Sequence, residues 1–250
     1  MAARRDFLAG MLLALAPTDT RNLEAGDIEI ATPDGERLPA YKAMPARGRN
    51  YACVLVIEEI FGLHAYIKDI CRRYAKLGYC AVAPDLLFRG RDPGKVPDAQ
   101  ALADLDAALR WAEAHGRIAA GKIAVTGYGW GGRLAWLYAA HQPKVRAGSA
   151  WYGPLAGPST AMQPRHPVDL AAGLRVPVLG LYGGQDRGIP LDTVLKMQSQ
   201  RRRGRSGSVL EVYEEAPHGF DADYRESYRK REAEDGWARV LAWYRKHGVG

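Results

Sequence analysis

Three short segments of this 250-residue chain carry the groups that attack on a carbonyl carbon requires. The first is a glycine-rich turn, Gly127 to Gly132, which follows the apolar run from Lys122 to Thr126. The second ends at Asp186 and the third at His218, and each comes after a later apolar run. A histidine that a carboxylate orients is a general base, and a tight turn that opens a helix offers N–H groups to a developing negative charge. This order indicates acyl-transfer chemistry such as ester hydrolysis.

The residue at the centre of the turn is Gly129, at the position where a nucleophile is expected. Glycine has no side chain and cannot form an acyl-enzyme, although it adopts a positive φ freely. Three explanations stay open. The protein binds a ligand without catalysis, or His218 (oriented by Asp186) activates a water molecule in the space of the missing side chain. In the third explanation, Gly129 is an engineered or sequence-level change in an ordinary hydrolase.

Short apolar runs alternate with longer helical patterns along the chain. Pro33-Asp34-Gly35 is a turn signal between two short strands and predicts an edge hairpin. Further strands are expected at 54–57, 81–83, 122–126, 147–152, 176–182 and 209–213, and helices at 67–77, 98–115, 133–140, 191–202 and 226–247. These units predict one domain, residues 23–250, with a mostly parallel central sheet and helices on both faces. The glycine-rich turn followed by Asp186 and then His218 is the order typical of the α/β-hydrolase fold. The stretch 153–173 is expected to be a surface excursion beside the site.

The chain resembles the dienelactone hydrolase (carboxymethylenebutenolidase-like) family of α/β-hydrolases from about Gly26 to the C-terminus. The resemblance implies a hydrolase of ester or lactone bonds. Gly129 departs from the family, which carries its nucleophilic cysteine at that position. Five segments carry the resemblance, in order: Ile57-Glu-Glu59-Ile-Phe-Gly62, Ala83-Pro-Asp-Leu-Leu-Phe-Arg89, Gly127-Tyr-Gly-Trp-Gly-Gly132, Gly183-Gly-Gln-Asp186 and Ala216-Pro-His218-Gly-Phe220.

The resemblance also implies roles for individual residues. Asp186 and His218 match the acid and the base of a catalytic triad. The N–H groups of Ile60 and Trp130 would form the oxyanion hole. Glu59 matches the carboxylate that, in the family, contacts the nucleophile and helps to set its charge state.

Glu59 and Arg89 carry charge near the predicted site. Glu59 follows an apolar strand, where an unpaired carboxylate is costly, so we expect it to pair with a cation or to hold a proton. With no thiolate opposite, its pKa is expected to rise, which makes it a second candidate base. By resemblance Arg89 binds the substrate carboxylate; the alternative is a plain surface arginine. Five aromatic residues are expected to bind substrate in an apolar pocket: Phe61, Tyr128, Trp151, Tyr152 and Phe220.

Other reactive side chains are weaker candidates. Ser149 lies inside a predicted strand and lacks the turn that presents a nucleophile. The three cysteines have no paired spacing and lie in or beside apolar stretches, so they are expected to be buried thiols. His64, His141 and His166 show no ligand spacing, so we expect no metal. Hydrolysis of this kind needs only water and preorganised donors, so we expect no cofactor.

Composition and charge limit the partners. The chain is 47% hydrophobic and 25% charged, as in globular proteins, and no apolar run reaches the ~18 residues that a spanning helix needs. The net charge of +7 favours anionic small substrates. The densest basic cluster, from Arg201 to Arg205, lacks the aromatic residues or the module of a nucleic-acid-binding surface. We expect a small-molecule substrate, no nucleic acid and no membrane span.

The N-terminal segment, residues 1–22, has two interpretations. Arg4-Arg5 before Phe7-Leu8 and a short apolar run resemble a twin-arginine export signal. The apolar run is short, and Pro17 follows the small-x-small site, which should hinder cleavage. The alternative is an amphipathic helix or a degenerate signal. We expect a cytoplasmic location, with the periplasm as the alternative.

The sequence as a whole predicts a hydrolase of small, anionic esters or lactones. Because the covalent nucleophile is missing, its activity is expected to be weak or to use water that His218 activates. The alternative is a non-catalytic protein that binds small molecules.

Overall fold

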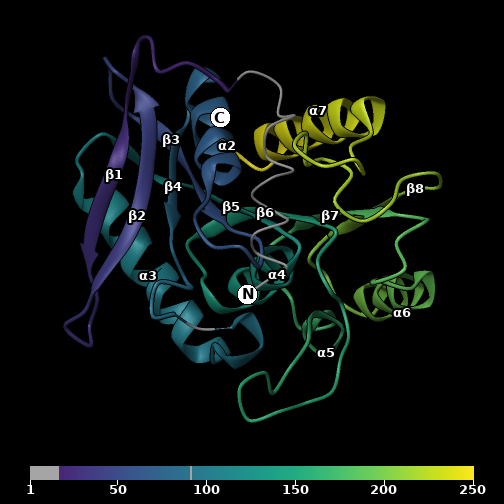
Figure 1. Cartoon of the computed structure of the whole chain (residues 1–250). Coiled ribbons are helices and arrows are strands. Elements are labelled where there is room, and N and C mark those ends of the chain that lie inside the picture. The colour runs from purple at the N-terminus through teal and green to yellow at the C-terminus, as the bar shows by residue number, and fades with distance from the viewer. Residues whose placement is uncertain (1–16, 91) are drawn as a thin grey trace.

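The computed structural model describes residues 17–90 and 92–250, which contain an eight-stranded sheet with helices on both faces (Figure 1). The strand order is β1-β2-β4-β3-β5-β6-β7-β8. The β1–β2 and β2–β4 pairs are antiparallel and the other five are parallel, which confirms the predicted architecture. The strands are β1 (Leu23–Ala31), β2 (Arg37–Pro45), β3 (Tyr51–Ile57), β4 (Cys80–Pro84), β5 (Ile118–Tyr128), β6 (Val145–Trp151), β7 (Val178–Gly183) and β8 (Val209–Tyr213).

Two groups of helices cover the two faces of the sheet. On one face, Tyr74 of α2 packs against Trp237 of α7, with ring centroids 4.9 Å apart. The other face carries α3, α4 and α6, which lie below the sheet in Figure 1. The helices are α2 (Ala65–Lys76), α3 (Asp98–Ala114), α4 (Trp130–His141), α5 (Pro167–Leu170), α6 (Leu191–Arg202) and α7 (Lys230–Lys246), with a 3₁₀ turn at Pro93–Lys95.

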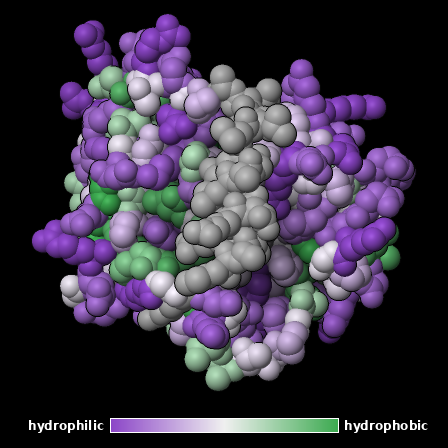
Figure 2. All heavy atoms as spheres, in the orientation of Figure 1, coloured by the Kyte–Doolittle hydropathy of each residue, from purple (hydrophilic) through white to green (hydrophobic). Residues whose placement is uncertain are grey.

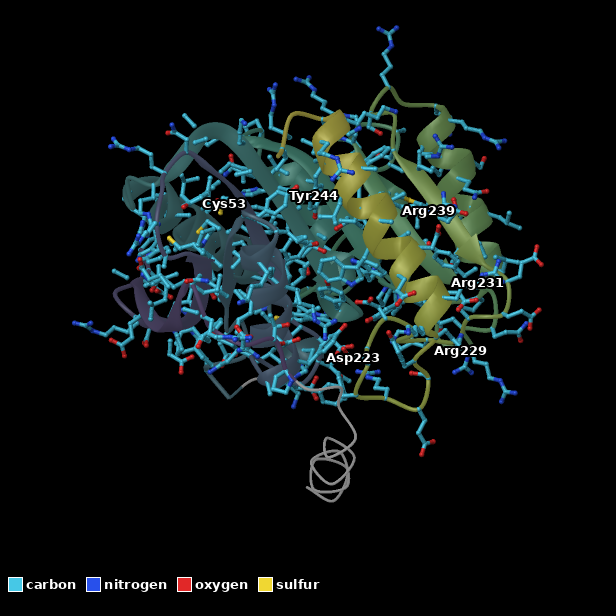
Figure 3. All side chains as sticks on the ribbon, turned by 90° about the horizontal axis from the view of Figure 1, so that it is seen from above. Cys53, Asp223, Arg229, Arg231, Arg239 and Tyr244 are labelled. Atoms are coloured by element: carbon cyan, nitrogen blue, oxygen red, sulfur yellow. The ribbon has the colours of Figure 1, made fainter. Side chains whose placement is uncertain are left out.

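The central strands are buried on both sides, which explains their unbroken apolar runs. In β3 every residue after Tyr51 is buried, because the strand lies between β4 and β5 and beneath helices on each face. The three cysteines are free and buried, as predicted, and Cys53 is labelled within the core in Figure 3. Burial raises the pKa of the Cys71 thiol, so this group is a poor nucleophile.

The outer surface is mainly hydrophilic on the face that Figure 2 shows, and hydrophobic residues form small separate groups there. Tyr244 lies on the inner side of α7 (Figure 3). Its hydroxyl donates to the carbonyl of Val125 at 3.1 Å, which ties α7 to β5. No helix among residues 17–90 and 92–250 is long and apolar enough to cross a membrane.

The structure differs from the predicted elements mainly at their ends. β5 begins four residues before Lys122, and α7 begins at Lys230 rather than at residue 226. The excursion at 153–173 contains α5, which the sequence did not predict. The guanidinium of Arg133 in α4 donates to the backbone carbonyl of Arg165 at 2.8 Å, which holds this excursion in place. The proposed twin-arginine pair lies outside the described residues.

Candidate active site

The glycine-rich turn joins β5 to α4, where the sequence placed it. Gly129 lies between Tyr128, the last residue of β5, and Trp130, the first residue of α4. Its φ of 54° and ψ of −116° form a conformation that glycine adopts without strain. The Gly129 N–H donates to the carbonyl of Trp151 at 3.0 Å, which fixes the turn against the end of β6.

Two further glycines let this turn pack closely. A Cβ on Gly127 would lie 2.0 Å from the carbonyl oxygen of Gly131. A Cβ on Gly131 would lie 2.3 Å from the carbonyl oxygen of Glu58, just beyond β3. Neither position has room for a side chain. The start of α4 is therefore held directly against the segment after β3, which contains Glu59 and Ile60.

The predicted acid and base are in contact. Asp186 follows β7 and His218 follows β8, and Asp186 Oδ2 lies 2.7 Å from Nδ1 of the imidazole. The other carboxylate oxygen, Oδ1, accepts the N–H groups of Gly188 at 2.8 Å and Ile189 at 3.0 Å. The Asp186 side chain is 1% exposed and that of His218 is 41% exposed. A fixed, buried carboxylate therefore orients an imidazole that solvent can reach.

The second nitrogen of His218 faces the turn. An ideal Cβ at Gly129 would lie 3.9 Å from Nε2 of His218. Apart from its chain neighbours, no other heavy atom of the described residues comes within 4 Å of that point. The base thus faces the place from which a nucleophilic side chain would extend.

Aromatic packing holds the imidazole in this position. The ring of Tyr152 meets the His218 ring edge-on, with centroids 5.1 Å apart, and Phe220 packs edge-on against Tyr152 at 5.6 Å. Tyr152 has a φ of 38°, which is unusual for a residue with a side chain. Such backbone strain persists where the surrounding structure enforces it, here directly after β6 and beside the base.

The two oxyanion candidates lie on either side of the contact between α4 and the segment after β3. Trp130 is the first residue of α4, so its N–H is one of the donors that have no acceptor within the helix. Ile60 lies in the turn that the Gly62 N–H closes on the Glu59 carbonyl at 3.4 Å. Donors at these two places can hold a carbonyl oxygen, and their role stays a prediction.

Glu59 is buried and paired, and the expectation of a raised pKa is wrong. Burial favours the protonated acid, but hydrogen bonds from His64 and Tyr224 and the charge of Arg225 outweigh it and lower the pKa of Glu59. The Arg225 guanidinium lies 2.8 Å from Oε1, and Tyr224 donates to Oε2. A carboxylate held in this way is a poor general base, which argues against Glu59 as the second candidate base.

The sequence did not identify Arg225 as a residue of the site, although a cation partner for Glu59 was expected. Its side chain lies over the ring of Phe61, 5.3 Å from the centroid, and donates to the Tyr224 hydroxyl at 3.0 Å. A Cβ on Gly219 would lie 3.0 Å from an Arg225 terminal nitrogen, so this arginine also reaches the residue after His218. The available sequence signal for a cation near the site was an arginine seven residues after His218.

Arg89 has other partners than a substrate. Its guanidinium contacts Asp104 at 2.8 Å and Asp34 at 3.0 Å, and it stacks on Phe88 at 4.1 Å. The two carboxylates balance the charge of Arg89. Because Asp104 lies in α3 and Asp34 lies in the turn between β1 and β2, Arg89 joins this helix to the hairpin. These contacts do not support the expectation that Arg89 binds the substrate carboxylate.

The expected aromatic pocket is mostly core. Tyr128, Trp151, Tyr152 and Phe220 are each 0% exposed, so they support the site from beneath and present no surface to a substrate. The expectation that they line a substrate pocket is therefore wrong. Phe61 is partly exposed and stays a candidate for substrate contact.

The remaining polar candidates are structural. The Ser149 hydroxyl is buried and contacts the hydroxyls of Thr126 and Tyr244, each at 2.8 Å. It lies in β6 and is not presented by a turn. Among residues 17–90 and 92–250, no group of three or more His, Cys, Asp or Glu side chains is placed to hold a metal ion.

Comparison with known proteins places the chain in a family. A family model described as "Dienelactone hydrolase family" matches residues 38–248. A "Putative carboxymethylenebutenolidase" of Methylorubrum extorquens is 48% identical over 96% of this chain and 90% of its own length. A protein of Yersinia pestis with the same name is 46% identical over 92% of this chain and 91% of its own length.

A solved structure shows the same fold. The crystal structure of a "Putative Dienelactone Hydrolase" from Klebsiella pneumoniae superposes with a TM-score of 0.86 and 46% identity, and covers 90% of this chain and 99% of that one. The α/β-hydrolase fold is thereby confirmed. Sequence, fold and the order of the candidate acid and base agree: the chain belongs to the dienelactone hydrolase family.

Proposed function

We propose that this protein hydrolyses small esters or lactones by direct attack of water, without an acyl-enzyme. The observation that carries this proposal is the placement of His218. Asp186 holds Nδ1 at 2.7 Å, and Nε2 lies 3.9 Å from the Cβ position of Gly129. Membership of a hydrolase family supports the reaction class, and Gly129 removes the covalent route.

The reaction needs one proton carrier and two donors. His218 Nε2 takes a proton from a water molecule beside Gly129 while the water oxygen attacks the carbonyl carbon. The N–H groups of Ile60 and Trp130 bind the carbonyl oxygen as it becomes negative. The bond to the leaving oxygen then breaks, and the imidazolium returns the proton to that oxygen. The products are an acid and an alcohol, which stay joined when the substrate is a lactone.

The proposed preference for anionic substrates rests on the net charge of the chain, because both candidate arginines are already paired. Arg225 lies 2.8 Å from the Glu59 carboxylate. Arg89 is held by Asp104 and Asp34. The net charge of +7 adds a field that attracts anions toward the protein.

Steady-state hydrolysis of a panel of small esters and lactones tests the proposal. We expect His218→Ala to lower kcat/KM by about 10²–10⁴-fold. Ser149→Ala is the control, because Ser149 is buried in β6, and it should leave kcat/KM unchanged. Mass spectrometry of acid-quenched wild-type protein should show no acyl adduct, whereas Gly129→Cys should form one. Turnover that survives His218→Ala, or an adduct on the wild type, would contradict the proposal.

A non-catalytic binding protein is the second candidate, because Gly129 offers no nucleophile. Calorimetry with small carboxylic acids, run beside the hydrolysis assay, separates the two functions. Saturable binding with no hydrolysis above background would replace the hydrolase proposal. Saturable hydrolysis that His218→Ala abolishes would exclude the binding protein.

A further inference from the structure

We propose that this protein also transfers acyl groups from its ester or lactone substrate to a small external thiol. The thiol would occupy the space beside Gly129 and would be activated by His218. This inference rests on the proposed function, because both reactions use the same base. It adds a second acceptor class, which competes with water for the same place.

The geometry permits a small molecule at that place. The Cβ position of Gly129 lies 3.9 Å from His218 Nε2, and it has no other close neighbour among the described residues beyond the adjoining ones. A sulfur atom one bond beyond that point is within reach of the nitrogen. The His218 side chain is 41% exposed, so a diffusing molecule can approach it from solvent.

The same geometry limits the size of the acceptor. Gly127 and Gly131 are packed directly against backbone atoms, so the turn is closely surrounded on those sides. The Tyr152 ring closes one side of the imidazole, and Phe220 supports that ring. The place corresponds to one short side chain, so methanethiol or ethanethiol should fit better than a branched thiol.

Proton affinity favours a thiol over water or an alcohol. A cysteine thiol loses its proton near pH 8.5 and a simple alkanethiol at a somewhat higher pH, whereas bulk water does so only near 15.7. Proton transfer to an imidazole is therefore far less uphill for a thiol than for water. Sulfur is also the stronger nucleophile toward a carbonyl carbon. A small thiol can thus compete with water at a far lower concentration.

The step balances without an oxidant or a reductant. The thiol proton passes to His218 Nε2 as the sulfur bonds to the carbonyl carbon. The carbonyl oxygen is held by the N–H groups of Ile60 and Trp130. The bond between that carbon and the leaving oxygen then breaks, and the imidazolium protonates the leaving oxygen. An ester gives a thioester and an alcohol, and a lactone gives a hydroxy thioester.

Product partitioning in the presence of ethanethiol tests the inference. The wild-type protein is given an unactivated ester at neutral pH, and the early yields of thioester and acid are measured by chromatography. We expect the thioester yield to rise with ethanethiol and to saturate. 2-Methyl-2-propanethiol and ethanol should give at least about tenfold less acyl transfer than ethanethiol. A tenfold difference requires only a small difference in the free energy of binding at this place.

Three variants identify the source of the activity. His218→Ala should abolish both products. Gly129→Ala places a methyl group in the acceptor space and should reduce the ratio of thioester to acid. Arg203→Ala, at the exposed end of α6, is the control and should behave as the wild type. The comparison of linear and branched thiols uses only the wild type, so the test does not depend on whether Gly129→Ala folds.

The outcomes separate this inference from the proposed function. Acid formation that requires His218, with thioester no higher than in His218→Ala, would overturn the inference and leave the hydrolase intact. A thioester yield that rises linearly and equally with both thiols would also overturn it. Thioester without acid would support the inference and contradict the water mechanism. Neither product would overturn both.

Discussion

The two carboxylate oxygens of Asp186 serve different partners, and one of them is His218. Oδ1 accepts two backbone N–H groups of its own loop, and Oδ2 lies 2.7 Å from His218 Nδ1. The loop hydrogen bonds hold the carboxylate in place independently of its contact with the imidazole. Nδ1 therefore carries the proton, and Nε2 is left as the acceptor toward Gly129.

Asp186→Asn tests whether the two carboxylate oxygens have these separate roles. The asparagine oxygen can keep the loop bonds to Gly188 and Ile189, so the fold should persist. Its amide donates where the carboxylate accepted, which favours the His218 tautomer with the proton on Nε2. We expect kcat/KM to fall by about 10²-fold or more with little change in Tm. An unchanged kcat/KM would show that Asp186 has only a loop-forming role.

Arg225→Met should destabilise the protein through Glu59. The side chain of Glu59 is 3% exposed, so loss of the guanidinium leaves a buried carboxylate with less compensation. We expect the free energy of unfolding to fall by about 3–5 kcal/mol in urea titrations. The double variant with Glu59→Gln should recover part of this loss, because it removes the buried charge. Equal stability of the single and double variants would contradict the argument.

Arg89→Met separates the structural role of Arg89 from substrate binding. Because Asp104 and Asp34 already hold the guanidinium, KM for substrates with a carboxylate should not change relative to KM for neutral ones. Stability should fall by about 1–3 kcal/mol, because Asp104 is buried and loses its cation. A selective rise in KM for anionic substrates would restore the role first expected for Arg89.

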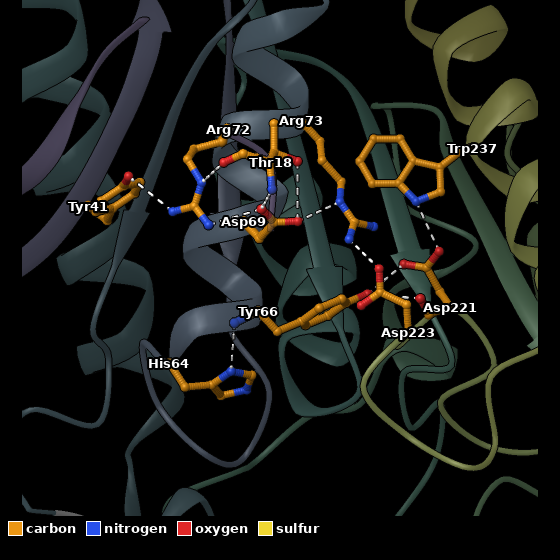
Figure 4. Close-up of polar contacts among 10 residues, drawn as sticks. All are labelled: Thr18, Tyr41, His64, Tyr66, Asp69, Arg72, Arg73, Asp221, Asp223 and Trp237. Carbon is orange, nitrogen blue, oxygen red and sulfur yellow. Dashed lines mark hydrogen bonds and ion pairs between the residues drawn. The ribbon is translucent and has the colours of Figure 1, made fainter. Parts of the chain in front are cut away.

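Asp221 should make stability depend on pH. Tyr66 and Trp237 donate to its carboxylate at 2.9 Å each, and Figure 4 shows it beside the Arg73–Asp223 ion pair. Burial, the largest cause, raises the pKa of Asp221 from 3.8 to about 7. The folded state therefore binds this proton more tightly than the unfolded chain does.

The sign of the effect follows from that difference. The contribution of Asp221 to stability is fully present below the unfolded pKa of about 3.9, and it is lost as the pH rises to about 7. The free energy of unfolding of the wild type minus that of Asp221→Asn should fall over this range, by up to about 4 kcal/mol. Urea titrations of both proteins at several pH values measure this difference. A difference that stays constant with pH would exclude a raised pKa.

The sequence alone determined the order of the main elements and singled out Asp186 and His218 as the candidate acid and base. Hydrophobic periodicity is local, so the strands, the helices and the turn at Gly129 could be read from neighbouring residues. Asp186 and His218 each follow a strand of one parallel sheet, and the ends of such strands meet at the same edge. Their contact was therefore predictable without coordinates.

Only the tertiary structure decided which charges and aromatic rings belong to the site. Glu59 and Arg225 are 166 residues apart in the chain, and no local pattern specifies their pairing. That pairing reversed the expected shift of the Glu59 pKa, since burial and ion pairing act in opposite directions. Partners from distant elements likewise engaged Arg89 and buried Tyr128 and Trp151. Burial and charge compensation depend on packing between elements, which the sequence pattern of each element does not contain.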